Sequence, residues 1–176
     1  MEEYNSLSNN NKYKILFVCL GNICRSPAAQ AVMERIVSER GVSDKVEIDS
    51  AGISGYHRGD LPDKRMRVHA ARRGLQLTHL SRPVTYGDFG RFDLIVGMDD
   101  ANVDDLRDMA MTLEDESKIV QISRFFRNYS GQDCIPDPYY GGSEGFENVL
   151  DLLDDACNTI ADLIQSGEIR DIENKL

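Results

Sequence analysis

The sequence lacks any long hydrophobic run. Its longest uninterrupted apolar segment, Ile15 to Leu20, has six residues, far below the roughly 20 that a membrane-spanning helix needs. The N-terminal residues also lack the basic start and the apolar stretch of a secretory signal. We therefore expect a cytoplasmic protein that does not associate with membranes.

Positive charge is scarce as well, because 20 lysines and arginines stand against 30 aspartates and glutamates, for a net charge of −10. This balance argues against broad binding to nucleic acids or to anionic membrane surfaces. An anionic substrate would need a local positive site. The four cysteines are expected to be thiols, because a cytosolic chain of this length does not depend on disulfides.

Internal repeats, long linkers and low-complexity blocks are also absent. A length of 176 residues fits one domain with a sizeable core. The polar residues 1–12 and the weakly patterned residues 167–176 are expected to fray. We therefore predict a single domain over residues 13–166 between two flexible tails.

Short apolar runs alternate with segments of helical spacing along this domain. The strands are expected at 15–18, 45–50, 94–96 and 118–122. The helices are expected at 27–40, 62–73, 100–110 and 143–165. Alternation of this kind implies parallel pairing with right-handed crossovers, hence an α/β fold: one doubly wound domain with a four-stranded parallel sheet flanked by helices. Ligands of such sheets bind at the carboxyl ends of the strands.

One loop connects the first predicted strand to the first predicted helix. Ser26 suits the N-cap of that helix and Pro27 its first helical position. Backbone amides that point inward and the positive end of the helix dipole would form an anion-binding nest of phosphate size. The Walker signature of nucleotide-binding loops is absent. The residues expected to hold the phosphate are Leu20, Gly21, Asn22, Ile23, Cys24 and Arg25.

One reactive and one charged side chain lie at the two ends of this loop. Cys19 opens the nest, and Arg25 closes it six positions later. A guanidinium can hold two oxygens of a tetrahedral anion in a planar fork, which a lysine cannot do. Because the guanidinium and the helix dipole both favour a thiolate, Cys19 is predicted to be a nucleophile.

Other segments extend the pattern beyond the loop: Asp49-Ser50-Ala51-Gly52, Thr78-His79 with Arg82-Pro83, Phe92-Asp93 to Met98-Asp99, and Asp137-Pro138-Tyr139-Tyr140. Together with the loop, and in the same order, they resemble segments of the low-molecular-weight protein tyrosine phosphatases. The resemblance covers roughly residues 13–165.

The resemblance implies a metal-independent enzyme, without a cofactor, that acts on tyrosine-phosphorylated proteins. Cys19 would form a phosphocysteine intermediate, Arg25 would clamp the phosphate oxygens, and Asp137 would serve as general acid and then as general base. Inorganic phosphate and similar oxyanions would compete with the substrate. The residues that match the family's loop scaffold are Asn22, Ser26, Ser50 and His79. Those that match the pocket rim are Gly55, Tyr56, Tyr139 and Tyr140, with Tyr56 in place of the family's frequent tryptophan. A monomer is expected.

Several alternatives accompany this interpretation. Cys19 and Cys24 have the spacing of metal ligands, but no second cysteine pair or histidine pair lies nearby in sequence. Cys24 could also form a protective disulfide with an oxidised Cys19 or simply pack beneath the loop. Cys134 and Cys157 are 23 positions apart, which disfavours the disulfide shuttle of an arsenate reductase with this fold.

Two further functions remain open. A protein-arginine phosphatase belongs to the same superfamily but has threonine at the position of Ile23, whose branched apolar side chain favours the tyrosine branch. A catalytically dead phosphate-binding adaptor would be expected to have lost Cys19, Arg25 or Asp137, and all three are present.

Overall fold

The computed structural model describes residues 11–174. Four strands form one parallel sheet in the order β2-β1-β3-β4. Their bounds are β1 Tyr13–Cys19, β2 Val46–Gly52, β3 Leu94–Gly97 and β4 Ile119–Gln121. The predicted α/β class and parallel sheet are confirmed, with β2 at one edge. Of the expected N-terminal tail, 1–12, only residues 11 and 12 lie within the described part of the chain.

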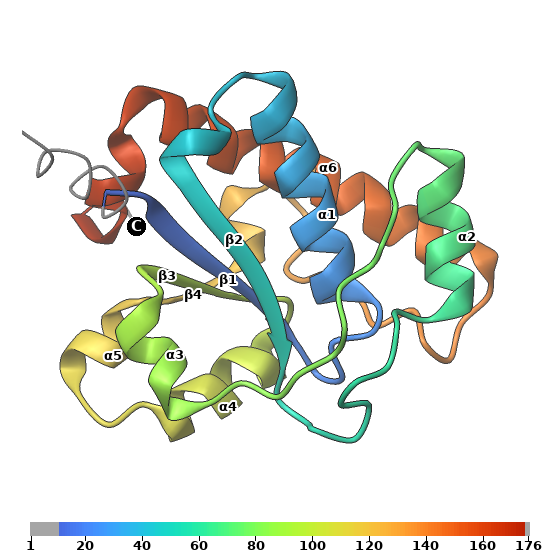
Figure 1. The fold of residues 1–176 in the computed structure, drawn as a ribbon, viewed down its shortest axis with the longest axis horizontal. Coiled ribbons are helices and arrows are strands. Elements are labelled where there is room, and N and C mark those ends of the chain that lie inside the picture. Colours follow the sequence, from blue (N-terminus) through green and yellow to red (C-terminus); the bar gives the residue numbers. More distant parts are fainter. Residues whose placement is uncertain (1–10, 175–176) are drawn as a thin grey trace, which may run out of the picture.

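Helices cover both faces of the sheet (Figure 1). Helices α1, α2 and α6 lie on one side, and α3, α4 and α5 lie on the other. Their bounds are α1 Arg25–Glu39, α2 Lys64–Arg72, α3 Tyr86–Arg91, α4 Asp100–Met109, α5 Leu113–Ser117 and α6 Ser143–Ser166. Three 3₁₀ helices complete the fold: η1 Ser43–Lys45, η2 Ile122–Phe125 and η3 Glu168–Asn174. Among the described helices, none is both long and apolar enough to cross a membrane.

Strand β1 lies at the centre of two hydrophobic cores. Ile15, Phe17 and Cys19 belong to the core beneath α1 and α6, whereas Leu16 and Val18 belong to the core on the opposite face. The alternation follows from the two-residue period of a strand. Since all five side chains are buried, β1 ends at a fixed point, and the loop after Cys19 begins there.

Helix α1 begins earlier than the sequence predicts. Arg25, not Pro27, is its first residue, and Ser26 is not its N-cap. The Ser26 hydroxyl is turned towards the preceding loop instead, where it bonds with Cys19 and Asn22. The first amides of α1 therefore have no side-chain cap, which leaves them available to an anion.

Two short helices escape the periodicity analysis. Helices α3 and α5 have 6 and 5 residues, which is too few for an apolar stripe to show. Local capping defines both of them. Thr85 and Asp88 form a capping box at α3, and Thr112 accepts a hydrogen bond from the amide of Asp115 at α5.

The chain beyond α6 is more ordered than the sequence predicts. The sequence predicts fraying over residues 167–176, but η3 occupies Glu168–Asn174, and residues 175 and 176 lie outside the described part of the chain. Ile169 and Ile172 are buried in the core beneath α1 and α6. Gly167, in the left-handed conformation at the C-cap of α6, turns the chain back towards this core.

Candidate active site

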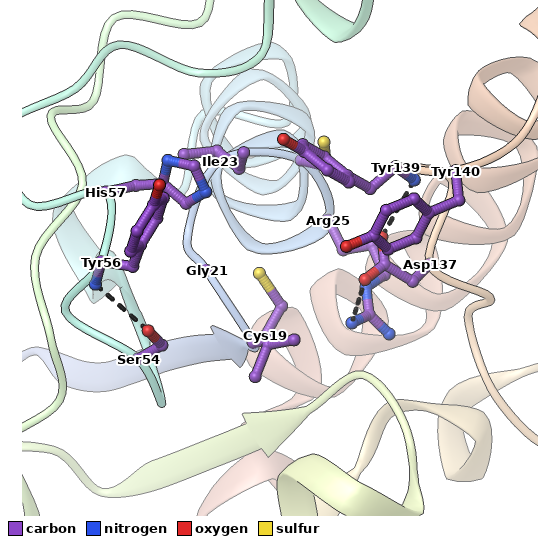
Figure 2. A pocket seen from close by; sticks show the side chains of 12 residues that line it. Cys19, Gly21, Ile23, Arg25, Ser54, Tyr56, His57, Asp137, Tyr139 and Tyr140 are labelled. Carbon is purple, nitrogen blue, oxygen red and sulfur yellow. Dashed lines mark hydrogen bonds and ion pairs between the residues drawn. The ribbon is translucent and has the colours of Figure 1, made fainter.

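The loop from Cys19 to Arg25 lies at the carboxyl end of β1, where the fold predicts a ligand site. Cys19 is paired with Gly52 of β2, and its neighbour Val18 is paired with Gly97 of β3. Figure 2 shows the Cys19 side chain pointing into a pocket between Tyr56 on one side and Asp137 on the other. This pocket has a volume of about 410 Å³.

Asn22 shapes the loop from within. Its φ of 54° makes it the one non-glycine residue with positive φ among residues 11–174. Its fully buried amide nitrogen donates to the hydroxyls of Ser26, at 2.7 Å, and Ser50, at 3.0 Å. Its amide oxygen accepts from Nε2 of His79, at 3.0 Å, and from the backbone N–H of Arg82, at 3.1 Å. The Asn22 side chain thus supports the loop and leaves only the backbone of this residue to face an anion.

Ser26 connects this network to Cys19. The sulfur of Cys19 lies 3.0 Å from the Ser26 hydroxyl oxygen, and the hydroxyl also receives the Asn22 hydrogen bond. The Ser26 hydroxyl is therefore placed within hydrogen-bond distance of the Cys19 sulfur, and it also lies 3.4 Å from the carbonyl oxygen of Ala51. The predicted scaffold residues Ser26, Ser50 and His79 therefore all lie in one network with Asn22.

Arg25 is almost entirely buried, and acidic side chains hold its guanidinium. Nη1 donates to Asp99 at 2.6 Å and to the carbonyl oxygen of Ile135 at 3.0 Å, and Nη2 lies 3.6 Å from Asp137. Burial by itself lowers the pKa of Arg25, but Cys19, Asp99 and Asp137 outweigh it and raise the pKa above its ordinary value. The guanidinium is therefore a permanent cation in a fixed orientation.

Asp99 is a residue of the candidate site that the sequence did not single out. It caps α4 by accepting from the amide of Asn102 with one carboxylate oxygen, and it holds Arg25 with the other. The Met98-Asp99 segment was noted only as part of the family pattern. Its position directly after the buried β3 strand, at the end of the sheet where the ligand loop lies, was the available signal.

Asp137 reaches the pocket from the segment before α6. Its carboxylate accepts a hydrogen bond from the backbone N–H of Tyr139 at 3.0 Å, and its side chain is 36% exposed. This exposure allows exchange of protons with water, which a general acid and base requires. The structure thus brings Cys19, Arg25 and Asp137 into a single pocket.

The pocket rim differs in part from the expectation. Tyr56, Tyr139 and Tyr140 line the pocket as predicted. Gly55 does not line it, because the position of its missing Cβ faces Pro83. Two neighbours that were not predicted line the pocket instead: Ser54 and His57. The amide of Arg58 donates to the carbonyl of Gly55 and closes a turn. This turn brings Ser54 and His57 to the pocket, and no local sequence pattern predicts it.

The remaining cysteines occupy different environments. Cys24 lines the pocket, and its burial, followed by nearby Asp63, raises its pKa well above the ordinary value. Cys157 is fully buried on α6, and burial raises its pKa too. Cys134 is half-buried in the loop before Asp137. No group of three or more potential metal ligands occurs in the part of the chain that the structure describes.

Sequence comparisons with known proteins match one family. The model of the family described as low molecular weight phosphotyrosine protein phosphatase matches residues 14–169. A low molecular weight protein-tyrosine-phosphatase of Streptomyces coelicolor is 40% identical over 145 residues, which are 82% of this chain and 88% of that protein.

Solved structures agree with these sequence matches. A protein tyrosine phosphatase from Entamoeba histolytica, with Hepes in its active site, is similar at a TM-score of 0.86 and 42% identity, over 89% of this chain and 99% of that one. A drosophila arginine phosphatase is similar at a TM-score of 0.77 and 33% identity, over 85% and 96% of the two chains. With a family model that matches nearly the whole domain and relatives near 40% identity, the chain belongs to the low molecular weight phosphotyrosine protein phosphatase family.

Proposed function

We propose that the chain hydrolyses phosphotyrosine in proteins through a phosphocysteine intermediate on Cys19. The observation that supports this most directly is the pocket in which Cys19, Arg25 and Asp137 meet at the carboxyl end of β1. A nucleophile, a cationic clamp and an exposed carboxyl group are the parts that phosphoryl transfer needs.

In the first step, the Cys19 thiolate attacks phosphorus, and the bond from phosphorus to the tyrosyl oxygen breaks. Asp137 gives its proton to the departing oxygen. Arg25 and the amides of the loop hold the three remaining phosphate oxygens as charge develops on them. This electrostatic stabilisation takes the place of a metal ion in the scheme.

In the second step, the Asp137 carboxylate takes a proton from water, and the water oxygen attacks phosphorus. The sulfur–phosphorus bond breaks, which releases phosphate and restores the Cys19 thiolate. Asp137 is then protonated again for the next cycle. The Ser26 hydroxyl, 3.0 Å from the sulfur, stabilises the leaving thiolate.

The pocket walls favour an aromatic substrate. Tyr56 and Tyr139 flank the entrance, and Ile23 lies on the loop between them. Flat and branched apolar surfaces favour a phenol ring through stacking and burial. Tyrosine-phosphorylated proteins are therefore the proposed partners, with inorganic phosphate as a competitive ligand.

A protein-arginine phosphatase is a second candidate, because a drosophila arginine phosphatase shares the fold at 33% identity. A phosphoarginine side chain carries a guanidinium, which a carboxylate would recognise. Asp137 is the one carboxylate among the residues that line the pocket in the described chain, and it already serves as the acid. The aryl substrate is therefore favoured.

We propose that the chain acts as a monomer, because Cys19, Arg25 and Asp137 already meet in one pocket of a single chain, and gel filtration of the active protein tests this. A reduced thiol nucleophile also suits the cytoplasm, where thiols stay reduced. Protection of Cys19 by Cys24 stays a prediction. Burial of the Cys24 side chain fits its alternative role as a packing residue.

The decisive experiment compares turnover of phosphotyrosine, phosphoserine and phosphoarginine peptides by the wild type and Cys19→Ser, with a chelator present. We expect the wild type to prefer phosphotyrosine and Cys19→Ser to bind phosphate without turnover, because a serine hydroxyl stays protonated where a thiol ionises. Near-normal turnover by Cys19→Ser would refute the nucleophile, and faster hydrolysis of phosphoarginine would favour the second candidate.

A further inference from the structure

An ion pair at the start of α2 lies between the loop from Cys19 to Arg25, which is the proposed phosphate loop, and the segment that contains Asp137. Asp63 caps α2 by accepting from the amides of Arg65 and Met66. The Arg65 side chain returns to the same carboxylate, with Nε 3.1 Å from Oδ1 and Nη2 3.0 Å from Oδ2. Two parallel hydrogen bonds of this kind fix the plane of the guanidinium.

One end of this pair is attached to the phosphate loop. The backbone N–H of Asp63 donates to the carbonyl oxygen of Ile23 at 2.8 Å. Ile23 lies two residues before Arg25 in the loop that surrounds the proposed phosphate site. The position of Asp63, and through it that of Arg65, is therefore set relative to the phosphate.

The other end is attached to the segment of the proposed general acid. Nη2 of Arg65 donates to the carbonyl oxygen of Tyr139 at 2.9 Å. The backbone N–H of the same Tyr139 donates to Oδ1 of Asp137 at 3.0 Å. The guanidinium also lies over the rings of Tyr139, at 5.6 Å, and Phe146, at 4.9 Å, which adds cation–π attraction.

Arg65 thus spans two segments that are far apart in sequence. Between Ile135 and Ser143, at the start of α6, the chain forms no helix or strand, so no regular ladder of backbone hydrogen bonds holds Asp137 in place. A hydrogen bond to the carbonyl of Tyr139 restrains the residue whose own N–H, in the preceding peptide group, holds Asp137. Figure 2 shows Tyr139 and Asp137 on the same side of the pocket.

We propose that Arg65 is a positioning residue that holds Tyr139 and thereby keeps the carboxyl group of Asp137 within reach of the leaving oxygen. The inference rests on the proposed function, since it requires Asp137 to be the general acid. Displacement of a reacting group by about 1 Å can lower a rate roughly 10²-fold, so a restraint of this kind matters for turnover.

The Arg65 side chain is 46% exposed, so loss of its guanidinium should be measured by catalysis and not by stability. Ion pairs with this much solvent contact contribute little to global stability. A variant without the guanidinium should therefore fold and keep its melting temperature. Its defect should appear in catalysis, and only where the acid is needed.

The test compares Arg65→Met with Lys64→Met, which removes the same charge from the exposed neighbouring residue. Two substrates are used: a phosphotyrosine peptide and an aryl phosphate with an acidic leaving group. We expect Arg65→Met to lower kcat/KM for phosphotyrosine about tenfold and to affect the activated ester much less, because a good leaving group needs no proton. Lys64→Met should match the wild type on both substrates.

Two further variants make the test specific. Arg65→Lys keeps the charge but lacks the planar fork of donors, so its activity should lie between that of Arg65→Met and that of the wild type. In an Asp137→Ala background, Arg65→Met should cause no further loss, because residues that act through one group are not additive.

Equal losses on both substrates, or a full additional loss in the Asp137→Ala background, would overturn the positioning role. The result for Asp137→Ala alone separates this failure from that of the proposed function. If Asp137→Ala slows both substrates equally, Asp137 is not the general acid. If Asp137→Ala is selective and Arg65→Met is not, only the inference about Arg65 fails.

Discussion

Asn22 shows at the residue scale how one side chain determines the shape of the phosphate loop. Its left-handed backbone conformation is one that asparagine tolerates better than most residues. Its amide group makes four hydrogen bonds, two through the nitrogen and two through the oxygen, so neither of its buried polar atoms is unpaired. Residue type, backbone and network therefore favour the same loop conformation.

His79 predicts a pH dependence of stability. Burial, with a smaller effect of Arg82, lowers its pKa below the ordinary 6.5, and the carboxylate of Asp49 offsets this only in part. Below about pH 6.5 His79 of the unfolded chain takes up a proton more readily than His79 of the folded protein. The neutral His79 therefore contributes its full share of stability above about pH 6.5, and this share is lost as the pH falls.

We therefore expect the free energy of unfolding of the wild type to fall more between about pH 7.5 and pH 5.5 than that of His79→Gln. Glutamine can still donate to Asn22 but does not titrate. Urea unfolding of both proteins at the two pH values measures the difference. An equal decrease in both proteins would show that His79 does not cause it.

Among the elements, the end of β2 and the phosphate loop are packed backbone against backbone. A Cβ on Gly52 would lie 3.0 Å from the carbonyl carbon of Gly21, 3.0 Å from the carbonyl oxygen of Ser54 and 3.1 Å from Cβ of Asn22. Two of these contacts are with main-chain atoms, which cannot rotate away. Only glycine allows the strand to pass this close beneath the loop.

Gly52→Ala is expected to displace the loop. Kcat/KM should fall about 10²-fold, because a shift of about 1 Å misplaces the amides around phosphate, and overpacking should cost about 1–3 kcal/mol of stability. Steady-state kinetics and urea unfolding measure the two effects. Gly90→Ala in α3, where an added Cβ meets nothing within 4 Å, is the control and should match or slightly exceed wild-type stability. An active, stable Gly52→Ala protein would contradict the tight contact.

For the molecule as a whole, the proposed site and the packing of the C-terminal segment lie at opposite ends of β1. The pocket lies where β1 ends, whereas η3 lies near its start, since Ile169 lines a surface pocket together with Tyr13. Figure 1 places the red C-terminal segment beside the blue start of β1. Ile169 is 2% exposed and closes the core at this end.

Ile169→Ala should therefore lower stability without changing the chemistry. We expect a loss of about 2–5 kcal/mol in the free energy of unfolding, because truncation leaves a cavity in the core. Kcat measured well below the melting temperature should stay at the wild-type value. Val68→Ala, at a position that is 43% exposed, should change stability by no more than about 0.5 kcal/mol. A fall in kcat for Ile169→Ala would show that the two ends of the sheet are coupled.

The sequence by itself determined the succession of elements that builds the site: a buried strand, a loop from Cys19 to Arg25, and a helix. These features depend on neighbouring residues, so local periodicity and spacing suffice to predict them. Short helices such as α3 and α5 depend on capping that periodicity does not register, and α1 begins at Arg25 without a side-chain cap. The packing of η3 depends on a core that forms only when the whole chain folds.

Only the tertiary structure decided which distant side chains complete the site. Asp99 holds Arg25 across 74 positions of sequence, and Arg65 reaches Tyr139 across another 74. His57 replaces Gly55 at the rim because a turn directs one residue inward and the other towards Pro83. The physical reason is that spacing along the chain determines which residues share a local element, whereas parallel strands and their loops determine which elements meet at one end of the sheet.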